Sequence, residues 1–213
     1  MENDTPNKIK ISKEIIATLP IETFPGKIVV IDNERDADNA VLQLNNERII
    51  GFDTETRPTF KKGKSNHVAL IQLSTHDTCY LFRINRIGFT PAIKNLLENE
   101  SLLKVGISLK DDFCMLSRLN GGQFIPKNFI ELQKFVKKYN IEDQSLQKIY
   151  GIVIGKKISK GQRLSNWEAD HLTENQQLYA ATDAWSCIKI YEVLKSGKFK
   201  SPIYPRLYKT TIL

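Results

Sequence analysis

The chain has 213 residues, and its 31 Lys and Arg against 24 Asp and Glu give a formal net charge of +7. An apolar fraction of 41% is too high for a mainly disordered chain. No stretch approaches the ~20 apolar residues of a membrane-spanning helix, and the N-terminus lacks the apolar core of an export signal. We therefore expect a cytoplasmic protein that makes no membrane contact, with a positive charge that favours an anionic partner such as nucleic acid.

The pattern along the chain predicts one domain over 27–195, preceded by a polar, loosely structured leader (1–26) and followed by a basic tail (196–213). A short helix is expected within the leader, near 12–18. Strands are predicted over 28–31, 49–55, 67–74, 79–84, 102–107 and 129–132, and helices over 36–44, 91–98, 110–119, 133–139, 145–154 and 174–195.

The order of these elements predicts the fold class. Strands 49–55, 67–74 and 79–84 have short connections and favour an antiparallel meander. Later strands alternate with helices, which is typical of parallel crossovers. We expect an α/β domain with a mixed sheet flanked by helices.

Asp53 and Glu55 stand two residues apart at the end of the predicted strand 49–55. Side chains alternate between the faces of a strand, so both carboxylates point to one face. The preceding Ile-Ile-Gly-Phe is apolar, and acids that emerge from a buried strand need a compensating partner. Carboxylate oxygens suit Mg²⁺ or Mn²⁺. The alternative is that both acids lie beyond the strand, in solvent.

Two further acidic features lie on predicted helices. Asp111 and Asp112 begin the helix after strand 102–107, where acids also stabilise a helix simply as caps. Tyr179 and Asp183 share a helix face at spacing i, i+4, next to an apolar stripe. Taken alone, that Tyr would usually be a core residue and that Asp a paired one.

Together, the acidic features indicate a shared site more strongly than any of them does alone. Acids at a strand end, a helix start and a helix face can converge on one point. Four carboxylates can hold two metal ions ~4 Å apart, which is the geometry for in-line phosphodiester hydrolysis. A nearby Tyr hydroxyl, with an ordinary pKa of ~10, would position the attacking water rather than act as its base.

Four segments carry a resemblance to a known family. They are Phe-Asp-Thr-Glu at 52–55, Val-Gly-Ile-Ser-Leu-Lys-Asp-Asp at 105–112, Leu-Ser-Asn-Trp at 164–167 and Leu-Thr-Glu-x-Gln-x-Leu-Tyr-Ala-Ala-x-Asp-Ala at 172–184. With them the chain resembles the DEDDy 3′-5′ exonucleases, chiefly the Werner-type exonuclease domain, with ribonuclease D a more distant relative. The resemblance spans about 27–195.

The resemblance implies a ribonuclease-H-like fold, two divalent cations (Mg²⁺ or Mn²⁺) and hydrolysis from the 3′ end of DNA or RNA that releases nucleoside 5′-monophosphates. Asp53 and Glu55 match the first motif, and Tyr179 and Asp183 match the third. Asp112 matches the second motif when the Gly at 106 is aligned without a gap, and Asp111 is the fallback. The metal ligands expected from the resemblance are thus Asp53, Glu55, Asp112 and Asp183, and Tyr179 completes the catalytic set.

Basic residues gather in two segments of loop composition. Lys and Arg there would contact phosphates irrespective of base sequence, or they are merely solvated. The candidates are Arg57, Lys61, Lys62 and Lys64 in the first segment and Lys157, Lys160 and Arg163 in the second. The sequence therefore predicts a metal-dependent 3′-5′ exonuclease acting on nucleic acid with a free 3′ end. The alternative is a non-catalytic nucleic-acid-binding module on the same fold.

Overall fold

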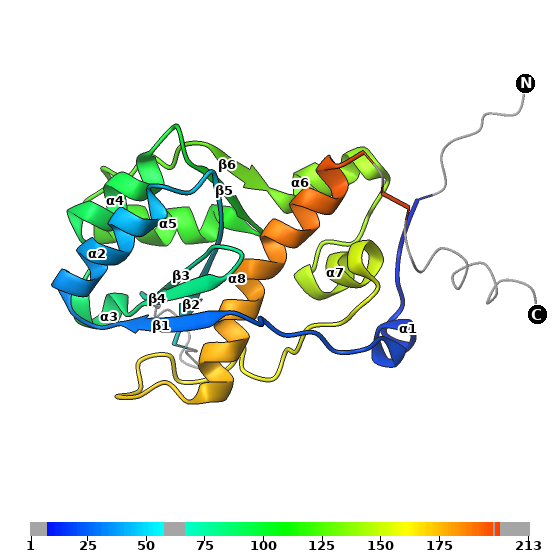
Figure 1. The fold of residues 1–213 in the computed structure, drawn as a ribbon, viewed down its shortest axis with the longest axis horizontal. Helices are drawn as coiled ribbons and strands as arrows, with labels where there is room; N and C mark the ends of the chain where they lie inside the picture. Colours follow the sequence, from blue (N-terminus) through cyan, green and yellow to red (C-terminus); the bar gives the residue numbers. More distant parts are fainter. Residues whose placement is uncertain (1–7, 58–66, 198, 201–213) are drawn as a thin grey trace, which may run out of the picture.

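The computed structural model describes residues 8–57, 67–197 and 199–200. These residues build a mixed six-stranded sheet in the order β1-β4-β3-β2-β5-β6, with helices on both faces (Figure 1). The strands are β1 Lys27–Ile31, β2 Ile49–Thr56, β3 Val68–Ser74, β4 Thr78–Phe82, β5 Leu103–Gly106 and β6 Phe129–Glu131. The helices are α1 Lys13–Thr18, α2 Glu34–Leu44, α3 Ile84–Ile87, α4 Pro91–Glu98, α5 Leu109–Leu119, α6 Leu132–Phe135, the 3₁₀ helix η1 Val136–Tyr139, α7 Leu146–Ile154 and α8 Glu174–Lys195.

The pairing confirms the predicted meander and mixed sheet. Strands β2, β3 and β4 pair antiparallel in sequence order, whereas β1, β5 and β6 join their neighbours in parallel. Predicted and observed boundaries agree to within two residues, and two of the differences alter an element. Strand β4 ends at Phe82 because Ile84 already begins the short helix α3, and the expected helix 133–139 is divided between α6 and η1.

Side chains along β2 alternate between the two faces of the sheet, and the two faces pack against different helices. Ile50 and Phe52 pack into a core with the apolar sides of α2, α4 and α5. Gly51 lies on the opposite face, where a Cβ would stand 1.9 Å from the carbonyl oxygen of Ala184. Helix α8 therefore crosses β2 in direct main-chain contact, and it does so beside the acids of that strand.

The N-terminal segment is packed, contrary to the expectation of a loose leader. Helix α1 forms where a helix was predicted, with Ser12 as its N-cap. Ile16 and Leu19 are buried together with residues of α7, and Phe24 packs edge-on against Trp185 of α8. The predicted tail lies largely outside the described residues. Within the described part of the chain, no helix has the length and apolarity needed to cross a bilayer.

A partly buried ion cluster connects this segment to the helices. The carboxylate of Glu22 accepts hydrogen bonds from the Tyr150 hydroxyl, from Lys156 Nζ at 2.7 Å and from Lys189 Nζ at 2.9 Å. Burial alone would raise the pKa of Glu22, but these donors outweigh it and hold the pKa at about 2. Residues 20–24 are thereby tied to both α7 and α8.

Candidate active site

Three carboxylates meet where β2 and α8 cross. Asp53 and Glu55 come from the α8-facing side of β2, and Asp183 comes from α8. Each offers an oxygen within 4.8 Å of those of the other two, an arrangement able to hold a metal ion. Helix α8 begins at a capping box formed by Thr173 and Gln176, which precede Tyr179 by six and three residues.

Asp112 reaches the same place from α5. It lines one hollow with the three clustered acids, but its carboxylate turns to Thr54, whose hydroxyl donates a hydrogen bond to it. Thr54 lies between the two acids of the first motif, and the sequence reading gave it no role. The sequence did contain one indication of this role, because alternation along the strand places the side chain of Thr54 on the opposite face from its acidic neighbours. Asp111 also lines the hollow, but it is exposed to solvent.

The start of α5 is held close to β2 by a second glycine. A Cβ on Gly106 would stand 2.9 Å from the carbonyl oxygen of Phe52 and 2.5 Å from the side chain of Leu109. Ser108 then adopts a left-handed conformation (φ 58°). Its backbone N–H and that of Leu109 donate to the Glu131 carboxylate at 3.0 and 2.8 Å. This capped turn delivers the adjoining acids to the hollow.

Protein groups compensate the negative charge of the cluster only in part. Burial, followed by the charges of Asp183 and the other acids, raises the pKa of Asp53 well above its ordinary value and that of Glu55 to about 9. Burial raises the pKa of Asp183 to about 7, against the opposing effects of the Tyr179 hydroxyl and the Lys160 charge. Burial likewise raises the pKa of Asp112 to about 6. Carboxylates arranged in this way favour a bound cation.

Tyr179 borders the acids as a neutral hydrogen-bond donor. Burial and the nearby charges of Asp183 and Glu55 raise its pKa far above the ordinary value, so the phenol keeps its proton. Its ring lies 6.1 Å from that of Trp167, centroid to centroid, and Trp167 is fully buried. The aromatic contact orients the hydroxyl, which lines the same hollow as the acids.

The predicted basic residues divide into three groups. Lys160 and Arg163 line the acidic hollow. Arg57 and Lys157 do not line it: the Arg57 guanidinium lies 3.3 Å from Glu168, and Lys157 donates to the carbonyl of Ala17 at 2.5 Å. The other three fall outside the described residues: Lys61, Lys62 and Lys64.

Comparison with known proteins agrees with this geometry. Residues 28–197 match the family model described as 3′-5′ exonuclease. The chain belongs to this family. It is 36% identical over 203 residues to the mouse bifunctional 3′-5′ exonuclease/ATP-dependent helicase WRN, a match that covers 89% of this chain and 14% of the mouse protein. An Arabidopsis thaliana 3′-5′ exonuclease is 28% identical over 83% of this chain and 66% of its own length. The chain thus spans less than two thirds of these relatives.

Solved structures share the fold at lower identity. The exonuclease domain of Aedes aegypti Nibbler superposes with a TM-score of 0.74 at 23% identity, covering 82% of this chain and 91% of that one. Escherichia coli RNase D gives 0.70 at 21% identity over 80% and 46%. Trypanosoma brucei RNase D, solved in complex with RNA, gives 0.69 at 20% over 89% and 66%. These similarities confirm the expected ribonuclease-H-like exonuclease fold.

Proposed function

We propose that this chain is a two-metal-dependent 3′-5′ exonuclease that removes nucleoside 5′-monophosphates from the 3′ end of a nucleic acid. The observation that supports it is the meeting of acids from β2, α5 and α8 in one hollow of about 380 Å³. Surface acids serving as caps would have no reason to converge there, and membership of the exonuclease family favours the same chemistry.

The donor set fits divalent cations of the hard, oxygen-preferring kind. Asp53, Glu55 and Asp183 would hold them directly, and Asp112 would join after exchanging its bond with Thr54 for a metal bond. We assign the second-motif role to Asp112 rather than Asp111 because Asp112 is the more buried of the two. Cations held by these residues would supply activation of water and stabilisation of the leaving oxygen.

The remaining residues act on the substrate. Tyr179 keeps its proton and can donate a hydrogen bond that orients the attacking water or the scissile phosphate. Lys160 and Arg163 place positive charge in the same hollow, where they would bind the phosphate backbone of the strand end. Both contacts are indifferent to base identity, as the removal of successive nucleotides requires.

The test is degradation of a 5′-labelled strand with Mg²⁺ or Mn²⁺ and with EDTA. Asp53→Asn and Asp112→Asn should each lower turnover by about a thousandfold, because metal stabilisation of a transition state is worth several kcal/mol. Asp111→Asn is the matched control and should keep most of the activity. Unchanged turnover in Asp53→Asn would refute the proposal, and full folding with nucleic-acid binding but no turnover in the parent would favour a non-catalytic module.

A further inference from the structure

A second hollow adjoins the acidic one and carries unpaired positive charge. It has a volume of about 690 Å³ and shares Ser108 and Asp111 with the acidic hollow. Lys110, Lys134 and Lys137 line it. All three are exposed, and none of their ammonium groups has a hydrogen bond or ion pair with any residue that the structure describes. Unpaired ammonium groups around a hollow are available to an anionic ligand.

The path continues beyond this hollow to the N-terminal segment. A third hollow, of about 370 Å³, shares Lys137 and Gln144 with the second and is lined further by Lys8 and Lys10. The three hollows therefore follow one another from the acids outward. We call the part beyond the acids the lysine groove, defined by Lys8, Lys10, Lys110, Lys134 and Lys137.

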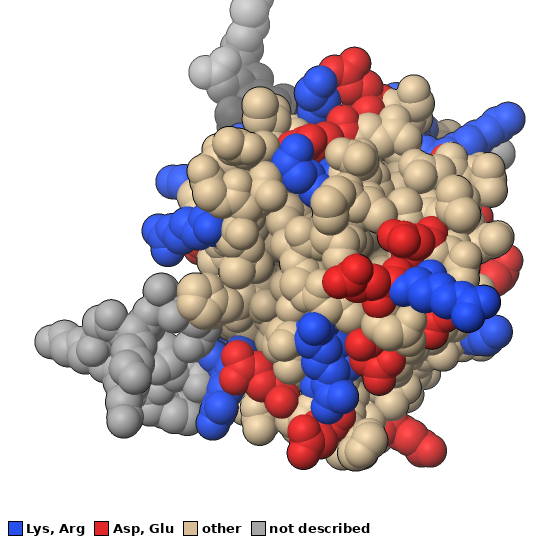
Figure 2. All heavy atoms as spheres, turned by 90° about the vertical axis from the view of Figure 1, so that its left-hand side faces the viewer, with Lys and Arg blue, Asp and Glu red and all other residues tan. Residues whose placement is uncertain are grey.

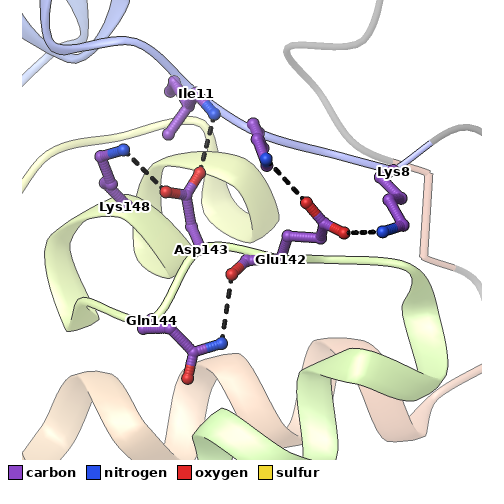
Figure 3. Close-up of polar contacts among 7 residues, drawn as sticks. Lys8, Ile11, Glu142, Asp143, Gln144 and Lys148 are labelled. Carbon is purple, nitrogen blue, oxygen red and sulfur yellow. Dashed lines mark hydrogen bonds and ion pairs between the residues drawn. The ribbon is translucent and has the colours of Figure 1, made fainter.

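The acids of the groove are already engaged. Glu131 accepts the backbone N–H groups at the start of α5. Glu142 lies between Lys8 Nζ at 2.5 Å and Lys10 Nζ at 2.8 Å (Figure 3). Among the acids lining the groove, Asp111 is the one without such a contact in the described part of the chain. The side chains that remain open to a ligand are thus mainly cationic.

The floor of the groove is fixed by contacts between distant segments. Gln133 Nε2 donates to Ser108 Oγ at 2.8 Å and to the carbonyl of Gln144 at 3.0 Å. At the outer end, Asp143 accepts the backbone N–H of Ile11 at 2.8 Å and Lys148 Nζ at 2.7 Å (Figure 3). A floor held in this way keeps the segments that carry the lysines in place without a ligand, so their backbone needs little reorganisation on binding.

We infer that the lysine groove binds the single strand that leads into the acidic hollow, with its ammonium groups on successive phosphates. This inference rests on the proposed function. The groove begins at the acids and runs in one direction, as one strand would. Phe113 and Phe129 also line it, and aromatic residues interleaved with cations are typical of single-strand sites.

The opposite end of the molecule provides a matched control. Helix α2 lies at the left-hand end of Figure 1, well apart from α6, and on that end Lys and Arg are interspersed with Asp and Glu (Figure 2). Lys27 lines a hollow together with residues of α2, and Arg35 is exposed on α2 itself. The double change Lys27→Gln/Arg35→Gln removes two charges, as Lys134→Gln/Lys137→Gln does in the groove.

Binding is measured first, without cleavage. In Asp53→Asn protein with EDTA, fluorescence anisotropy of a labelled single strand is followed against salt concentration. The groove double variant should bind more weakly, and its salt slope should fall by about 1.4, since each phosphate contact on a single strand contributes about 0.7. The control pair should bind like its parent. Any of three results would overturn the inference: an equal loss of affinity in both double variants, no loss of affinity in the groove variant, or a loss confined to duplex substrates.

Turnover then separates this inference from the proposed function. In otherwise unaltered protein with Mn²⁺, the groove variant should lose kcat/KM on a long strand but not on a dinucleotide, because the single internucleotide phosphate of a dinucleotide is the scissile one and none is left for the groove. Full activity on both substrates would refute the groove and leave the exonuclease standing. If the parent protein shows no turnover but its binding still depends on the groove, the exonuclease proposal is refuted and the groove stands. Lys110→Gln, on a different helix, gives the same test if the double variant does not fold.

Discussion

Glu22→Gln tests how the N-terminal segment contributes to stability. Glu22 is the shared acceptor of Tyr150, Lys156 and Lys189, and it holds a pKa of about 2 against an ordinary 4.5. An amide keeps the shape of the side chain but removes its charge. The folded state then loses the ion pairs of Glu22 with Lys156, which follows α7, and with Lys189 of α8.

The size and pH dependence of the loss follow from the pKa. A fall from 4.5 to about 2 corresponds to about 3 kcal/mol, at about 1.4 kcal/mol for each tenfold change in proton affinity. Because the pKa of this acid is lowered by folding, the stabilisation is complete above pH 4.5 and disappears as the pH falls towards 2. Glu22→Gln should therefore lower the free energy of unfolding by about 3 kcal/mol at pH 7 and by about 1 kcal/mol at pH 3.

Urea unfolding of both proteins at several pH values measures this difference. At neutral pH the loss should also lower the melting temperature by about 6 to 12 °C for a chain of this length. Glu100→Gln is the control, because Glu100 pairs with Lys127 on an exposed surface, where a salt bridge contributes little. A loss in Glu22→Gln that is the same at pH 3 as at pH 7 would show that charge is not the cause.

Four further predictions concern the site. Mn²⁺ should raise the melting temperature more at pH 8 than at pH 6, because protons held at the raised pKa values of Glu55 and Asp183 compete with the cation; Asp183→Asn should abolish the increase. Without a cation, calorimetry should show the fold losing stability as the pH rises from about 5 to 9, because the folded acids keep protons that the unfolded chain has released. Tyr179→Phe should lower kcat while titration calorimetry finds unchanged Mn²⁺ affinity. Gly51→Ala should lower the free energy of unfolding by about 3 kcal/mol in a urea titration, since the added methyl would overlap the backbone of α8.

The sequence was sufficient for the features that depend on local periodicity. Spacing of two placed Asp53 and Glu55 on one face of β2, and spacing of four placed Tyr179 and Asp183 together on α8. The meander followed from short connections between strands. The meeting of α8 with β2 is a long-range contact, and its prediction depended on the family resemblance as well as on the acids themselves.

Features made by distant partners were not predictable from local pattern. The segment 8–26 looks polar, but its isolated apolar residues, such as Ile16 and Leu19, find a core only when α7 is in place. The hydrogen bond from Thr54 to Asp112 joins residues 58 positions apart. Lys134 and Lys137 were not predicted as binding residues because no acidic motif adjoins them in the sequence. Only the fold brings them next to the acidic hollow.

The absence of a side chain at position 51 fixes the distance between the acids on β2 and the acid on α8. Because the main chain of α8 rests on that of β2, the separation of the acids on the two elements is set by bare backbone and not by any compressible packing layer. Substitutions on the outer surface of α8 can accumulate without altering this spacing. A residue with a side chain at 51 would displace the helix and every group it carries at once, so drift in this family should spare that position even though it touches no substrate.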